Sequence, residues 1–91
     1  MIRIDKFLKL SMLVKRRTVA QEMTEIGAVR VNGHQCKSAQ NVKEGDIVEI
    51  AYPRRIIEAR VICADEQQLR RRAVAYELIC ERRADPDEKP W

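Results

Sequence analysis

Residues 18–33 read TVAQEMTEIGAVRVNG, and within them the spacing of apolar residues changes from a helical to a strand period. Thr18 and Gln21 have the spacing of a capping box, in which two side chains bond the free N–H groups at the start of a helix. Gly27 stands where a left-handed residue commonly ends a helix. An apolar stripe lies between them at Val19, Ala20, Met23 and Ile26. The pattern predicts a helix over about 19–26.

A β-hairpin is predicted directly after this helix. Val29 and Val31 alternate with Ala28 and Arg30, which is the period of a strand. Asn32-Gly33 follows, and this pair is the strongest short signal for a two-residue hairpin turn. We expect a short partner strand over 35–37.

A second helix is predicted before this segment, over about 4–10. One face of it carries apolar side chains and a serine at helical spacing, at Ile4, Phe7, Leu8 and Ser11. We expect Phe7 to lie in the core rather than to stack on a base. Residues 11–17 then form a turn that ends in three consecutive basic residues.

The remaining elements are predicted downstream of the hairpin. They are a tight turn over 42–46, strands over about 47–52 and 56–63 interrupted at Pro53, and a helix over about 66–75 capped by Asp65. Residues 76–80 fit either an extension of that helix or a last short strand. The polar, acidic residues 84–91 are expected to be a disordered tail.

Positive charge is concentrated at the start of the chain. Residues 1–20 hold six basic side chains and one acid, whereas residues 21–91 hold 12 bases and 13 acids, and the whole chain has a net charge of +4. A basic face at one end of an otherwise balanced domain is typical of a nucleic-acid binder. A solvated basic face beside a core is the alternative explanation.

The candidate binding site lies around the start of the helix predicted at 19–26. A helix N-terminus carries partial positive charge, so the cations that precede it cost stability unless an anion such as phosphate is bound there. Asp5, an acid inside the basic face, is expected either to hold Arg17 or Lys9 by a charge-assisted bond or to stabilise the first helix. The predicted RNA-binding residues are Arg3, Asp5, Lys6, Lys9, Lys15, Arg16, Arg17 and Thr18, with secondary contacts at Arg54, Arg55 and Lys37.

A second basic cluster, Arg70-Arg71-Arg72, has acidic neighbours at Glu66, Glu77 and Glu81. A salt-bridged, exposed helix therefore explains this cluster at least as well as an RNA contact does.

The composition argues against several other classes of function. The three cysteines, Cys36, Cys63 and Cys80, form no C-x-x-C pair, and His34 is the single histidine, so no metal site is expected. We expect free thiols, with Cys63 and Cys80 as small buried residues. No catalytic set, cofactor motif, signal peptide or membrane-spanning run is visible, so the sequence predicts a non-enzymatic protein without a cofactor.

Four short segments together resemble the S4 domain, an RNA-binding module named after a small-subunit ribosomal protein. The segments are RIDKFL at 3–8, KRRTVA at 15–20, GAVRVNG at 27–33 and VKEGD at 42–46, and the likeness covers residues 1 to about 60. Over roughly residues 1–80 the chain resembles the RqcP family of ribosome-associated quality control, relatives of heat-shock protein fifteen.

The resemblance implies an α+β fold of the alpha-L type, with two N-terminal helices packed on a small, bent antiparallel sheet and a C-terminal helical extension. The expected division is an S4 domain at 1–64, an extension packed on it at 65–83 and a tail at 84–91. By position in this chain, Arg3, Asp5 and Arg17 match the family's functional N-terminal motif, with Lys15 and Arg16 beside them.

The resemblance also implies a function. Members of the family bind stalled, split large ribosomal subunits that carry peptidyl-tRNA, contact large-subunit rRNA and tRNA, and support C-terminal alanine tailing by RqcH. A monomeric, cytoplasmic, ribosome-associated protein is expected. Two alternatives stay open: an accessory RNA-binding module of another ribonucleoprotein or modification enzyme, and an adaptor that binds an acidic protein partner.

Overall fold

The hairpin predicted at Asn32-Gly33 forms in the computed structural model, which describes residues 1–85 and 87. Asn32 and Gly33 have φ angles of 51° and 82°, the positive values that a tight type I′ turn requires. The turn joins strands β2 (Val29–Val31) and β3 (His34–Gln35). The partner strand is therefore His34–Gln35 rather than 35–37.

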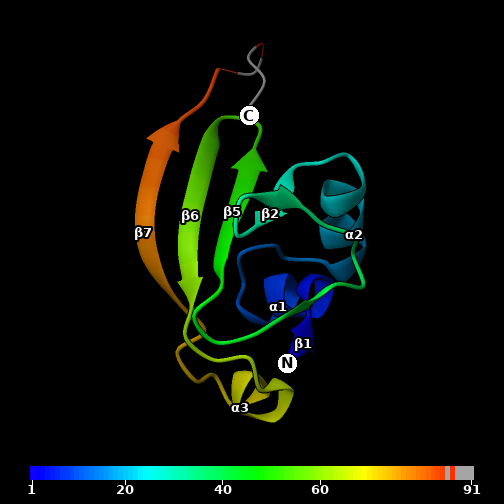
Figure 1. Cartoon of the computed structure of the whole chain (residues 1–91), viewed down its shortest axis with the longest axis vertical. Helices are drawn as coiled ribbons and strands as arrows, with labels where there is room; N and C mark the ends of the chain where they lie inside the picture. Colours follow the sequence, from blue (N-terminus) through cyan, green and yellow to red (C-terminus); the bar gives the residue numbers. More distant parts are fainter. Residues whose placement is uncertain (86, 88–91) are drawn as a thin grey trace.

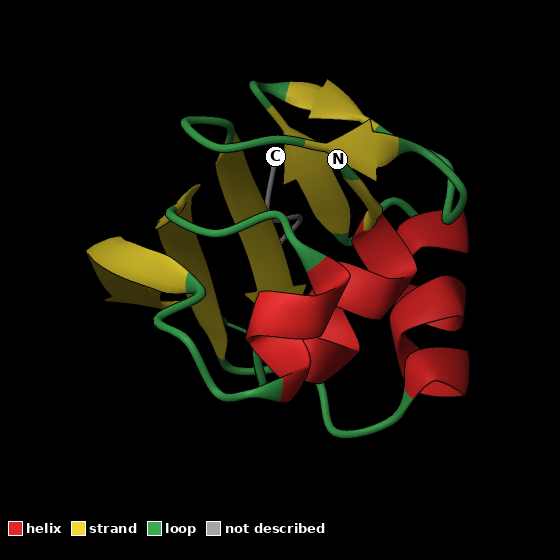
Figure 2. Ribbon diagram, turned by 90° about the horizontal axis from the view of Figure 1, so that it is seen from below, coloured by secondary structure: helices red, strands yellow, loops and turns green. Residues whose placement is uncertain are grey.

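The main sheet is antiparallel and has the strand order β3-β2-β5-β6-β7. Its longer strands are β5 (Ile47–Tyr52), β6 (Arg55–Val61) and β7 (Tyr76–Arg83). Helices α1 (Ile4–Leu10) and α2 (Arg17–Glu25) lie together beside the β2–β5 part of the sheet, and β7 forms its far edge (Figure 1). Seen from below, the helices gather on one side of the molecule and the strands on the other (Figure 2).

The core lies between these two layers. Ile4, Phe7 and Leu8 of α1 are fully buried against Val48 and Ile50 of β5 and their neighbours. Burial of apolar area on this scale is the main stabilising contribution to the fold. The predicted core position of Phe7 is confirmed.

A small second sheet, which the sequence pattern did not predict, pairs β1 (Ile2–Arg3) with β4 (Asn41–Val42). Two-residue strands are too short to show a period. The pairing continues as a hydrogen bond of 2.7 Å from the backbone N–H of Ile4 to the carbonyl of Gln40. The loop before β4 is thereby placed against the first turn of α1.

The start of α2 differs from the prediction. The helix begins at Arg17 rather than 19, and its N-cap is Arg16, whose side chain makes no capping bond. Thr18 therefore lies inside the first turn and not at the N-cap, so the Thr18–Gln21 capping box does not form. The side-chain amide of Gln21 donates to Asp5 instead. The predicted end of the helix is confirmed, since Gly27 has a φ of 80° directly after the C-cap.

The C-terminal extension is shorter in helix and longer in strand than predicted. Helix α3 spans Glu66–Arg70 and not 66–75, although Asp65 caps it as expected by accepting from the N–H groups of Gln67 and Gln68. Residues 76–80 belong to strand β7, which pairs with β6. The extension is therefore a short helix followed by a strand that enlarges the main sheet.

Smaller predictions in the second half of the chain are also corrected. Strand β6 begins at Arg55, so only Arg54 of the two hairpin arginines lies in the turn, and β6 ends at Val61 rather than 63. Cys63 is buried as expected, but Cys80 is exposed because it lies on the edge strand β7. Most of the predicted tail, Pro86 and residues 88–91, lies outside the described residues.

Candidate nucleic-acid interface

The carboxylate of Asp5 is the centre of the candidate site. Asp5 lies in the first turn of α1, and its side chain has no exposed surface. The carboxylate accepts hydrogen bonds from Arg3 (Nε 3.2 Å and Nη2 3.0 Å), from Arg17 (Nε 3.2 Å) and from Gln21 (Nε2 2.9 Å). The backbone N–H of Lys6 adds a bond of 2.8 Å. We call these five residues the Asp5 cluster.

The cluster joins three elements that are separate in the sequence. Arg3 ends β1, Asp5 and Lys6 lie in the first turn of α1, and Arg17 and Gln21 lie one turn apart on α2. A buried carboxylate must be paired, because the cost of removing its charge from water is large. The two arginines are therefore fixed in position relative to both helices.

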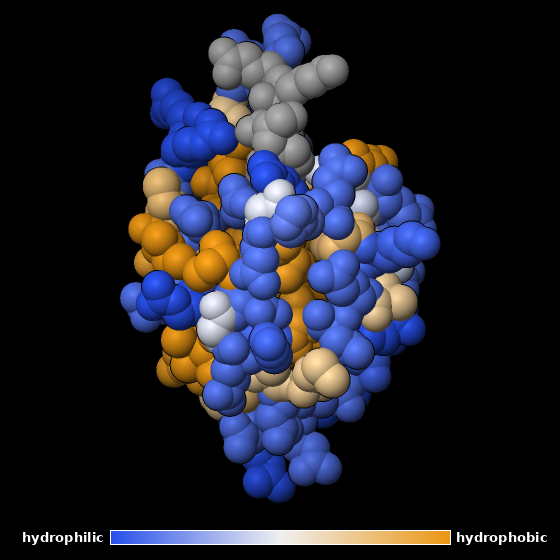
Figure 3. All heavy atoms as spheres, viewed as in Figure 1, coloured by the Kyte–Doolittle hydropathy of each residue, from blue (hydrophilic) through white to orange (hydrophobic). Residues whose placement is uncertain are grey.

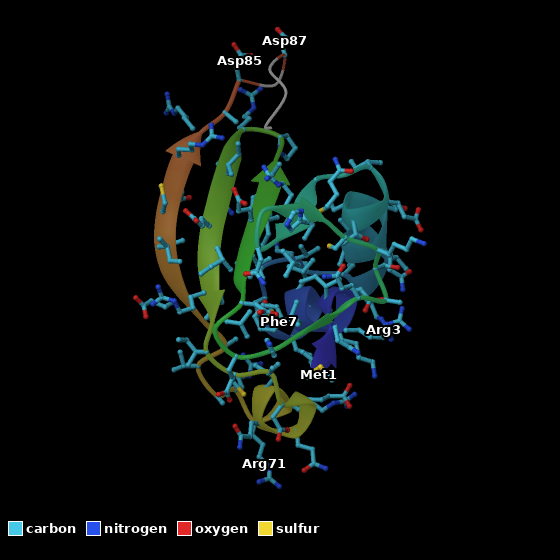
Figure 4. The ribbon with its side chains drawn as sticks, in the orientation of Figure 1. Met1, Arg3, Phe7, Arg71, Asp85 and Asp87 are labelled. Carbon is cyan, nitrogen blue, oxygen red and sulfur yellow. The ribbon has the colours of Figure 1, made fainter. Side chains whose placement is uncertain are left out.

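Both arginines keep part of their donor capacity for an outside ligand. The side chains of Arg3 and Arg17 are each 41% exposed. Arg17 contacts Asp5 through Nε alone, so its terminal nitrogens can donate to an acceptor outside the protein. Figure 4 shows Arg3 on the side of α1 away from the sheet and Phe7 on the side toward it. Such a guanidinium, oriented by a buried acid, matches the geometry of a phosphate group.

Asp5 is held in its charged form. Burial raises the pKa of its carboxyl group, but the hydrogen bonds from Gln21, Arg3, the Lys6 N–H and Arg17 together lower it further, so the pKa lies below its usual value of 3.8. At neutral pH the cluster therefore contains an ionised acid. Of the two partners expected from the sequence, Arg17 is confirmed, whereas Lys9 does not contact Asp5.

The N-terminus of α2 is the second part of the site. Lys15 and Arg16 are exposed beside it, and its first turn contains no acid and no side-chain cap. The free N–H groups at this end carry partial positive charge. With Arg17 and the exposed Thr18 in the first turn, this end of the helix offers a cluster of donors to an anion.

The other predicted residues are distributed unevenly. Lys6 forms an ion pair of 2.8 Å with Glu66 and so attaches α3 to α1, while Lys9 is exposed near the far end of α1. Lys37 is exposed in the loop whose next residue, Ser38, accepts a hydrogen bond from the N–H of Asp5. Lys37 therefore lies near the Asp5 cluster.

Arg54 and Arg55 lie apart from this site. They are located at the hairpin between β5 and β6, at the end of the molecule opposite α3 (Figure 1). Arg55 pairs with Glu81 at 3.3 Å and lies 4.8 Å from the centre of the Tyr52 ring. The structure does not bring these two arginines together with the Asp5 cluster.

Gln21 is the site residue that the sequence pattern assigned to another role. Its signal is its position four residues after Arg17, which places both side chains on the same face of α2. Nothing in the local pattern shows that Asp5, 16 positions earlier, faces this pair.

The site offers cationic and N–H donors. Within residues 1–85 and 87, no group of His, Cys, Asp or Glu side chains is arranged to hold a metal ion. No helix within these residues has the length and apolar character needed to cross a membrane.

Comparison with known proteins finds similar chains. A sequence profile of the S4 domain family matches residues 2–48. A relative from Listeria monocytogenes, named RQC P-site tRNA stabilizing factor, is 41% identical over 85 residues, which cover 92% of each chain. Relatives of the same name from Bacillus subtilis and Helicobacter pylori are 40% and 43% identical, covering 66% and 67% of this chain and 70% and 73% of their own lengths.

A solved structure shares the fold. Heat Shock Protein 15 of Vibrio cholerae, described as trimeric, superposes with a TM-score of 0.74 at 20% sequence identity, covering 86% of this chain and 81% of that one. At this identity the likeness concerns the fold alone. It agrees with the mixed helical and antiparallel architecture expected from the sequence.

Proposed function

The chain belongs to the S4 domain family, among the RQC P-site tRNA stabilizing factors, and from that premise we propose that it stabilises peptidyl-tRNA on large ribosomal subunits left by stalled translation. It acts as a non-enzymatic RNA-binding factor that contacts large-subunit rRNA and tRNA. It works in the cytoplasm on the ribosome, as a single copy, and supports C-terminal alanine tailing by RqcH.

The observation that supports this proposal is the Asp5 cluster beside the uncapped start of α2. A-form RNA is recognised mainly through its shape, its phosphates and its 2′-hydroxyls. Arg3 and Arg17 present oriented donors to such a surface, and Lys15 and Arg16 add charge that attracts the backbone. Phe7 is buried and does not stack on bases.

The test is binding to purified large subunits, with and without peptidyl-tRNA, measured by co-sedimentation. Arg17→Ala removes a charge-assisted donor and is expected to weaken binding roughly tenfold or more. Arg83→Ala is the matched control, because it removes one positive charge from an exposed position at the opposite end of the molecule. Equal binding by Arg17→Ala and the wild type would contradict the proposed site.

Asp5→Asn separates an organised site from a surface that works by net charge. The substitution makes the protein more positive, so a simple electrostatic surface would bind RNA more tightly. Because Asp5 orients Arg3 and Arg17, we expect weaker binding, with circular dichroism confirming that the variant is folded.

Two further measurements test the partners. Nuclease treatment should release the protein from subunits, whereas an adaptor for an acidic protein would be retained. In cells that lack the protein, stalled nascent chains should carry shorter RqcH-dependent alanine tails, and tails of normal length would contradict the link to RqcH.

A further inference from the structure

A second basic site lies outside the Asp5 cluster, in a groove of about 670 Å³ between the end of α1 and the connection from α3 to β7. We propose that this groove binds phosphates of an RNA backbone, as a second contact that rests on the proposed RNA-binding function. The groove is lined by Lys9, Arg70 and Arg72, and its lining contains no acidic residue.

The acids expected to neutralise these arginines are engaged elsewhere. Glu77 and Glu81 lie on β7, where they pair with Arg60 at 3.9 Å and with Arg55 at 3.3 Å. This arrangement follows from the early end of α3, which separates the acids from the arginines.

Of these three acids, Glu66 is the one that pairs with an arginine of the Arg70-Arg71-Arg72 segment. It is bound to Lys6 at 2.8 Å and lies 3.9 Å from Arg70. Within the described part of the chain, the side chains of Arg71 and Arg72 form no ion pair. The salt-bridged helix expected from the sequence is thus limited to Arg70, and the charges of Arg71 and Arg72 are available to a ligand.

The backbone at Arg72 is a second, independent observation. Arg72 has a φ of 66° and follows the C-cap of α3, at the position where helices favour glycine. The left-handed turn is closed by hydrogen bonds from the N–H of Arg72 to Leu69 and from that of Ala73 to Gln68. An arginine in a backbone conformation that favours glycine costs stability, and a use for its side chain would account for that cost.

The groove also offers apolar surface and lies near the Asp5 cluster. Met12 and Val74 line it and are 63% and 71% exposed, so apolar surface lies beside the cations. Such surface can contact riboses and bases while the arginines hold phosphates. Lys9 lies four residues after Asp5 on α1, a rise of about 6 Å along the helix axis. Arg71, at the exposed end of α3 (Figure 4), extends the charged surface further.

Arg72→Gly tests the proposal, because it removes the charge and relieves the backbone strain at once. We expect the melting temperature to rise by a few degrees, while affinity for large subunits carrying peptidyl-tRNA falls about three- to tenfold and the log–log salt slope becomes shallower by roughly 1. This opposite movement of stability and binding is not expected of a residue with a structural role only.

Two matched variants serve as controls. Arg72→Lys keeps the positive charge in the same left-handed backbone conformation. Arg83→Ala removes one charge at the far end of β7. Both should bind subunits within about twofold of the wild type, a small effect beside that of losing a phosphate contact.

The outcomes separate this proposal from the function on which it rests. If Arg72→Gly binds like the wild type while Arg17→Ala does not, the second site is overturned and the proposed function stands. Equal losses in Arg72→Gly and Arg72→Lys would also overturn it, because the loss would then not depend on the positive charge. Binding to phosphatidylglycerol vesicles tests whether the groove holds lipid phosphates instead. If Arg72→Gly loses vesicle binding but keeps its affinity for subunits, the proposal is also overturned.

The RNA that occupies the groove is identified by repeating the measurement with vacant subunits and with free tRNA. A loss confined to tRNA-carrying subunits and free tRNA assigns the groove to tRNA. A loss that extends to vacant subunits but spares free tRNA assigns it to rRNA. Either result supports the proposal.

Discussion

Asp5 shows how an acidic residue can fix the geometry of a basic surface. Its carboxylate has no exposed surface and accepts bonds from two arginines and a glutamine. Removing a partner from a buried charge is costly, so the arginines are held in place by the energy of pairing Asp5. Charge at this site is therefore positioned and not only accumulated.

The lowered pKa of Asp5 predicts how stability depends on pH. In the unfolded chain the carboxyl titrates near 3.8, and in the folded protein its pKa is lower. The stability that the charged form contributes is therefore fully present above the unfolded pKa and is lost as the pH falls through the folded pKa. Asp5→Asn should lack this contribution at every pH.

Urea unfolding of the wild type and of Asp5→Asn over a pH series measures this effect. The difference in free energy of unfolding should be constant from about pH 8 to 5 and should shrink below about pH 4. A difference that remains unchanged at the acid limit would show that Asp5 does not titrate as its surroundings indicate.

At the scale of the element, the N-terminus of α2 lacks the capping bond and the acidic residues that usually stabilise the start of a helix. Its N-cap is Arg16, which makes no capping bond, and the preceding Lys15 adds charge that opposes the helix dipole. A serine or aspartate would be the stabilising choice at this position. This choice of residues is what we expect if an anion binds at the N-terminus of α2.

Replacing the N-cap residue is expected to raise the stability of the protein and to weaken its binding to large subunits. Arg16→Ser should stabilise the protein by about 0.5–2 kcal/mol, because Arg16 already has the extended backbone that an N-cap requires. The same variant should bind large subunits more weakly. Urea unfolding and co-sedimentation measure the two effects.

Thr18→Ala is the control for this substitution. Because Thr18 lies inside the first turn and does not cap the helix, its loss should change stability by less than about 0.5 kcal/mol. If Thr18→Ala instead costs about 1 kcal/mol and Arg16→Ser has no effect, the capping box predicted from the sequence would be correct.

At the scale of the whole molecule, basic residues lie toward both ends. The molecule measures 38 × 23 × 22 Å, with the N-terminus and α3 toward one end and the β5–β6 hairpin at the other (Figure 1). Hydrophilic side chains cover most of the face shown in Figure 3, and apolar side chains gather on the side where β6 and β7 lie. The basic residues that we assign to RNA lie on or directly beside β1, α1, α2 and α3.

This distribution predicts a steep dependence of RNA binding on salt. If four to six of the basic side chains meet phosphates, the log–log slope of affinity against salt should be roughly −3 to −5. Titration of the protein against large subunits between about 50 and 200 mM salt measures this slope. A slope near zero would mean that neutral contacts carry the binding.

The sequence by itself determined the elements whose signals are local. The Asn32-Gly33 turn, the end of α2 at Gly27, the extent of α1 and the buried position of Phe7 all follow from backbone preferences and apolar spacing within a few residues. The basic N-terminal face was visible for the same reason, because charge can be counted without knowing the fold.

Only the tertiary structure decided which residues meet. Gln21 bonds Asp5 instead of capping its own helix. Glu77 and Glu81 pair with strand β6 instead of with Arg71 and Arg72, and β1 finds β4 about 40 positions later. Each of these contacts joins segments that are distant in the chain. The partner of a buried charge or of an unpaired strand depends on which residues lie nearby in the folded structure. Local patterns do not contain that information, because it arises only when the two layers close over Ile4, Phe7 and Leu8.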